Sequence, residues 1–123
     1  MTVQELYTSI GGSYDSAKKI LQMDKLIGKF ILKFLNDKSC DRLLTAGAAR
    51  DAEGIFEGAH ALKGVCANLG LDSLSAAASE LAEAYRPGKG AQMDGAELDS
   101  RLSAIKQQYD STVAGIQLFA SGQ

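Results

Sequence analysis

Apolar residues recur along this chain at spacings of three and four, which predicts amphipathic helices. Between Asp24 and Leu35 the apolar positions are Leu26, Ile27, Phe30, Ile31, Phe34 and Leu35. Three lysines share the opposite face of this segment: Lys25, Lys29 and Lys33. Alternation with a period of two, which would indicate a strand, fails throughout. We therefore expect an all-α protein.

Capping residues and helix breakers divide the second half of the chain. Asp51 is a predicted N-cap of a helix that runs to about Leu69, where Gly70 is suited to end it. Asp72 is a predicted cap of the next helix, which ends before Pro87, the only proline. The pair Asp94 and Glu97 resembles a capping box and predicts the start of the last helix.

The remaining segments are shorter. We expect a small helix from about Asp41 to Ala46, ending near Gly47. At the N-terminus, Gly11 and Gly12 separate two short amphipathic stretches, the second of which Ser13 can cap. Four long helices with short connections predict an antiparallel four-helix bundle of up-down-up-down topology. We expect one domain over residues 1–123, with the bundle core at about 24–119 and one or two short helices within 1–22.

Composition limits the class of protein. Hydrophobic residues make up 46% of the chain and charged residues 23%, the balance of a soluble globular protein. A net charge of -2 gives no reason to expect nucleic acid as a partner. No apolar run is long enough to span a membrane, and no signal peptide precedes the helices. We therefore expect a cytoplasmic protein that does not bind a membrane.

The cysteines indicate no metal chemistry. Cys40 and Cys66 are predicted to be plain thiols, with Cys66 in the core. One histidine and two cysteines do not readily supply the ligands of a zinc site. We therefore expect no cofactor and no metal of the protein's own.

The only histidine, His60, lies in the helix that follows Asp51. The apolar stripe of this helix predicts which side is buried: Ile55, Ala59, Leu62, Cys66 and Leu69. At about 100° per residue, His60 points roughly 140° away from that stripe. We therefore expect an imidazole exposed to solvent.

The neighbours of His60 are unusual for a passive helix surface. Gly64 follows one turn later on the same face, although glycine costs about 0.5–1 kcal/mol there relative to alanine. Ala67 lies beyond it, Phe56 lies one turn before, and Lys63 is within reach at the third position. Two further glycines, Gly54 and Gly58, add to the small side chains of this helix. We interpret Gly64 as room for a partner beside the imidazole, and Phe56 and Ala67 as partner-binding residues.

These residue types suit phosphoryl transfer. A neutral imidazole is a good nucleophile near pH 7. Attack on an aspartyl phosphate would give a phosphoimidazole, and a carboxylate could discharge it by the reverse attack. The Lys63 ammonium could neutralise the equatorial oxygens. No Mg²⁺ ligands surround His60, so a metal would have to come with the partner.

The stretch from Ala59 to Gly70, AHALKGVCANLG, resembles the signature of bacterial histidine phosphotransfer domains. The histidine, the Leu-Lys-Gly run after it and the closing Leu-Gly pair are all in register. The resemblance extends from about Leu26 to Ile116. It implies that His60 is phosphorylated on Nε2, that Lys63 gives electrostatic support and that Gly64 gives access. It also implies as partners a response-regulator receiver domain, a hybrid sensor histidine kinase, or both.

Two positions depart from the family pattern. Val65 stands where many members carry a small hydroxyl residue, and we expect only a packing difference. Ala82 stands where some members carry a Gln or Glu that hydrogen-bonds the imidazole Nδ1. Either Glu83 reaches across in its place, or Nδ1 faces water.

The leading hypothesis is a phosphocarrier without turnover of its own that acts as a monomer. A start at Met1 and a small polar tail favour a free-standing protein over a domain of a hybrid kinase. The alternative is a helical protein-interaction module in which His60 is incidental. An enzyme that uses His60 as a general base is disfavoured, because a convex helix surface offers no pocket and no orienting acid.

Overall fold

The computed structural model describes residues 1–89 and 93–122. Every regular element in this part of the chain is helical, which confirms the all-α prediction. The elements are α1 (Val3–Ile10), α2 (Tyr14–Leu21), α3 (Asp24–Lys33), the 3-10 turn η1 (Phe34–Asn36), α4 (Ser39–Ala48), α5 (Ala52–Asn68), α6 (Asp72–Ala84) and α7 (Gly95–Ser121). No helix within the described ranges is long and apolar enough to cross a bilayer.

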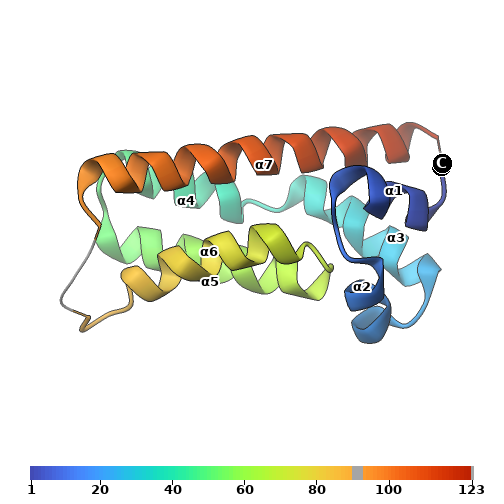
Figure 1. Ribbon diagram of the computed structural model, residues 1–123, viewed down its shortest axis with the longest axis horizontal. Helices are drawn as coiled ribbons and strands as arrows, with labels where there is room; N and C mark the ends of the chain where they lie inside the picture. Colours follow the sequence, from blue (N-terminus) through green and yellow to red (C-terminus); the bar gives the residue numbers. More distant parts are fainter. Residues whose placement is uncertain (90–92, 123) are drawn as a thin grey trace.

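The helices form an elongated bundle (Figure 1). Helix α7 runs along the whole molecule, with α4 and α3 beside it one after the other. Helices α5 and α6 form a hairpin, and α5 also packs on α4. The short helices α1 and α2 lie at the end of the bundle that holds α3 and the C-terminal part of α7.

Side-chain caps set most of the helix starts as predicted. The Asp51 carboxylate accepts the Gly54 N–H at 3.2 Å, and the Asp94 carboxylate accepts the Glu97 N–H at 2.8 Å. Asp72 is a correction, because it is the first residue of α6 and Leu71 holds the cap position. Its carboxylate instead accepts the Ser16 hydroxyl at 2.9 Å, a tertiary contact that no local pattern indicates.

The predicted helix over 24–35 also differs from the structure. Helix α3 ends at Lys33, and the chain tightens into η1 before α4 begins. Phe30, which the periodicity places on the buried face, is 37% exposed. The ring lines a groove between α2, α3 and the end of α5, so packing covers only part of it. Helix α1 is joined to the bundle by a hydrogen bond. The buried Tyr7 hydroxyl donates to the Leu69 carbonyl at 2.6 Å.

Both cysteines are fully buried, and burial raises the pKa of each thiol to about 12. The thiolate is the reactive form, so at mildly alkaline pH almost none is present in the folded protein. We expect a thiol-specific reagent such as dithiobis(nitrobenzoate) to modify neither Cys40 nor Cys66 in the native state and to modify both in denaturant. Fast release of the chromophore from native protein would contradict this burial.

Candidate functional site

Helix α5 presents His60 to solvent. Its predicted apolar stripe is buried between α4, α6 and the rest of the core: Ile55, Ala59, Leu62, Cys66 and Leu69. His60 directly follows Ala59, which is fully buried, and one residue turns the helix by about 100°. The imidazole is accordingly exposed. The site is therefore on an open helix face rather than in a cleft.

The glycines of α5 serve two different purposes. A Cβ on Gly58 would lie 2.8 Å from the Leu43 Cα, and one on Gly54 would lie 2.9 Å from the Ala46 Cβ. These two glycines let α4 approach α5 closely and face away from His60. From the sequence, Gly54, Gly58 and Gly64 were assigned to one role, a helix surface with small side chains. In the structure Gly54 and Gly58 lie against α4, and Gly64 does not.

Gly64 has no packing partner. Apart from its chain neighbours and the backbone of its own helix, a Cβ at this position would meet no atom within 4 Å, and the residue is exposed. Ala67, one turn further on, is also exposed. The fold itself thus gives no reason for a glycine in the middle of this helix. What the glycine does is lower the surface beside the His60 ring.

Phe56 stacks on the imidazole. The two ring centroids are 5.6 Å apart and the ring planes meet at 20°. A stacked ring covers one face of the imidazole, whereas both nitrogens carry their lone pair or hydrogen in the ring plane. The stacked ring therefore does not block an attack by an imidazole nitrogen, whose lone pair points out of the ring edge. Half-buried Phe56 was expected to contact a partner; its stacking on His60 was missed, although the four-residue spacing of the two rings allows it.

Lys63 lies on the side of α5 that faces α6. Its carbonyl accepts the Ser75 hydroxyl at 3.0 Å, which joins the two helices one turn beyond His60. Its side chain is half-buried, and among the described residues its ammonium forms no ion pair. Three residues after His60, the side chain therefore carries a positive charge that no direct ion pair with a described residue neutralises.

The neighbouring helix offers no partner for the second imidazole nitrogen. Ala82 is only 5% exposed and belongs to the core. The Glu83 carboxylate accepts a hydrogen bond from the Arg86 guanidinium, and this contact lowers the pKa of the Glu83 carboxyl. In the antiparallel register set by Ser75 and Lys63, Glu83 also lies more than one helical turn from the level of His60. Of the two alternatives, an Nδ1 that faces water agrees with this geometry.

A comparison with protein-family models matches the Hpt domain over residues 19–112. The match covers most of the chain, includes α3 to α6 and most of α7, and contains the whole α5 site. The chain belongs to the Hpt domain family. Domains of this family take part in histidine phosphotransfer in phosphorelays as phosphocarrier modules, and they interact there with receiver domains and kinases. Searches of curated proteins and of solved structures returned no match.

The two kinds of glycine predict opposite effects of alanine on stability. Gly58→Ala should lower the free energy of unfolding by about 1–3 kcal/mol, because the new methyl meets the Leu43 backbone. Gly64→Ala should raise it by about 0.5–1 kcal/mol, because the methyl meets nothing and helix propensity improves. Urea denaturation followed by circular dichroism measures both. A destabilising Gly64→Ala would show that Gly64 has a structural role.

Proposed function

We propose that this protein accepts a phosphoryl group on His60 from receiver-domain aspartates, and donates it to them, in a two-component phosphorelay. The observation that carries the proposal is the exposed imidazole beside a glycine that the fold does not need. A partner domain must bring its aspartyl phosphate within bonding distance of an imidazole nitrogen. The open surface at Gly64 and Ala67 leaves room for that approach.

The transfer needs one nitrogen and no pocket. The Nε2 lone pair of a neutral His60 ring attacks the phosphorus in line with the bond to the aspartyl oxygen. The N–P bond forms as the P–O bond breaks, and the bonding electrons of P–O return to the aspartate as carboxylate. The Nδ1 proton stays on the ring, or passes to water and returns from water when the phosphoryl group leaves. The reverse attack by a carboxylate oxygen of another receiver regenerates the neutral imidazole.

Charge near the phosphoryl group comes from two sources in this proposal. The Lys63 ammonium, three residues after His60, offsets the negative charge of the equatorial oxygens. Among the described residues no group of three or more His, Cys, Asp or Glu side chains is placed to hold a metal ion. In this proposal the receiver domain supplies the Mg²⁺.

The protein acts in this proposal as a monomeric carrier without turnover of its own. Its partners are a response-regulator receiver domain, a hybrid sensor histidine kinase, or both. The α3–α4 segment, α5, α6 and α7 would form the up-down-up-down bundle, with α1 and α2 as an N-terminal addition. The packing of α5 on α4 and α6, and of α7 on α4 and α6, supports that topology.

Replacement of His60 tests the proposal directly. Incubation with a phosphorylated receiver domain should label the wild type with a phosphoryl group that is labile to acid and stable to alkali, as expected for an N–P bond. His60→Gln should take up no label, because an amide cannot attack phosphorus in this way. If His60→Gln labels equally, or if no receiver in a broad panel labels the wild type, the protein is instead an interaction module.

Substitution at Gly64 tests the account of access. Gly64→Gln should slow transfer from the receiver by about tenfold or more, since the side chain would stand where the partner must approach. The fold should remain intact because the position is open. Gly64→Ala is the matched control and should slow transfer much less. Equal rates for wild type and Gly64→Gln, measured by rapid-quench labelling, would contradict this role.

A further inference from the structure

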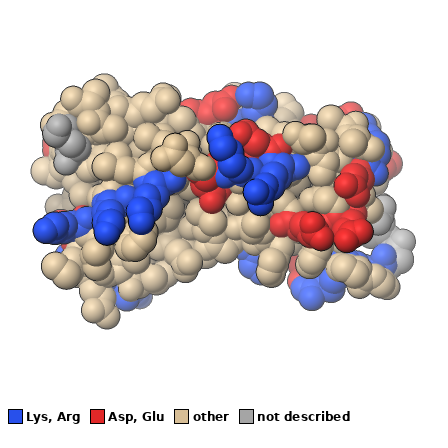
Figure 2. All heavy atoms as spheres, turned by 180° about the vertical axis from the view of Figure 1, so that it is seen from behind, with Lys and Arg blue, Asp and Glu red and all other residues tan. Residues whose placement is uncertain are grey.

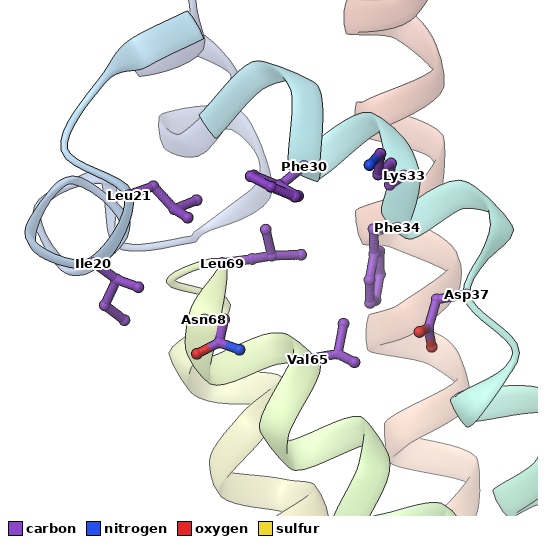
Figure 3. Close-up of a pocket in the computed structure, with 9 residues that line it drawn as sticks. All are labelled: Ile20, Leu21, Phe30, Lys33, Phe34, Asp37, Val65, Asn68 and Leu69. Atoms are coloured by element: carbon purple, nitrogen blue, oxygen red, sulfur yellow. The ribbon is translucent and has the colours of Figure 1, made fainter. Parts of the chain in front are cut away.

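A groove of about 410 Å³ lies between α2, α3 with η1, and the C-terminal end of α5 (Figure 3). Figure 3 shows side chains from these elements around one common space. The apolar residues that line it are Ile20, Leu21, Phe30, Phe34, Val65 and Leu69. Ile20 is 50% exposed and Phe30 37%, so two large apolar side chains at this hollow are in contact with water. Apolar surface gathered around a hollow marks an interaction site more often than scattered exposed residues do.

The groove is continuous with the His60 surface. Gly64 and Asn68 follow His60 at successive turns of α5, and Asn68 lines the groove. From His60 to Asn68 the helix rises about 12 Å. A standard interface buries about 800 Å² on each partner, which corresponds to a circle of about 16 Å radius. A protein domain centred on His60 can therefore extend as far as the groove.

Charge favours this direction over the opposite one. Lys25, Lys29 and Lys33 are exposed on one face of α3, and none of them forms an ion pair with another described residue. Figure 2 shows a row of basic side chains across the end of the molecule that holds α3; further along this face basic and acidic side chains are mixed, with acidic groups toward the opposite end. On the other side of His60, the N-terminal half of α5 carries the exposed Glu53 and Glu57.

Two charged residues line the groove itself. The Lys33 ammonium lies 5.1 Å from the centroid of the Phe30 ring, beside the apolar lining. Asp37 is engaged elsewhere, because its carboxylate accepts the Ser39 N–H at 2.9 Å at the start of α4. The groove therefore combines an apolar hollow with a positive charge that has no acidic partner among the described residues.

Resting on the function proposed above, we propose that the receiver domain docks toward the α3 end. It would insert an apolar side chain into the α2–α3–α5 groove and set acidic side chains against Lys33. The partner face that carries the reacting aspartate also has to hold a divalent cation, which requires further carboxylates. Such a face is attracted to the lysine row and repelled by Glu53 and Glu57.

Three exposed positions test the docking surface without disturbing the core: Ile20→Asp, Phe30→Ala and Lys33→Glu. The probe is the receiver domain that labels wild-type His60, and the measurements are its Kd by calorimetric titration and its transfer rate. Ile20→Asp should weaken binding by about tenfold, because a carboxylate would have to be desolvated in the groove. Phe30→Ala should also weaken binding of the receiver domain. Lys33→Glu should weaken binding more at low salt than at high salt, since the ion pairs are screened.

Matched controls carry the same chemical changes at residues that do not line the groove. Leu118→Asp alters an exposed apolar residue of α7 that is 64% exposed, and Lys89→Glu reverses an exposed lysine beyond α6. Both should bind the receiver as the wild type does. Labelling of His60 by phosphoramidate, a small donor that needs no docking surface, should be equal in all variants.

The outcomes separate this proposal from the proposed function. If the receiver labels the wild type but binds the three groove variants as tightly, the docking surface is wrong and the carrier function stands. A parallel loss of phosphoramidate labelling would place the effect at His60 instead and would also overturn the docking surface. If no receiver labels the wild type, the proposed function fails and the docking surface fails with it.

Discussion

The close contact of α4 with α5 depends on Gly58, which lies against the backbone of Leu43 where no side chain would fit. Together with α6 on the other side, this contact buries the apolar stripe of α5 and so determines the rotation of the helix about its axis. Each residue turns the helix by about 100°, so the rotation that buries Ala59 exposes His60. The bond from Ser75 to the Lys63 carbonyl joins α5 to α6 near the same level. His60 is thus oriented by packing that it takes no part in.

In the proposed function most of the catalytic apparatus belongs to the partner, and the site itself can be simple. In that proposal His60 offers a nucleophile, the stacked Phe56 orients its ring, and Lys63, three residues away, offers one charge. A carrier that both receives and donates phosphate must let different domains reach the same nitrogen, and a deep pocket would hinder that exchange. The unneeded glycine at position 64 agrees with this view, since the helix gives up some stability there and gains open surface.

Several features could be predicted from the sequence because they depend on local patterns. The N-cap at Asp51, the stop at Gly70 and the outward direction of His60 follow from capping chemistry and helical periodicity. Asp72 was wrongly predicted to be an N-cap. It is the first residue of α6, and its carboxylate accepts a hydrogen bond from Ser16 of another helix. Phe30 was placed inside because its spacing matches the core face, but the groove between α2, α3 and α5 leaves part of its ring exposed.

The sequence by itself determined the helical class, the helix that carries His60 and the side of that helix which faces water. These follow from the order of residues within one turn or two, where each side chain's direction is set by its neighbours along the chain. Only the tertiary structure decided which glycines admit a neighbouring helix, how Phe56 lies on the imidazole and where α2, α3 and α5 leave a groove. These depend on distances between segments far apart in the sequence, which packing of the whole core sets and periodicity does not encode.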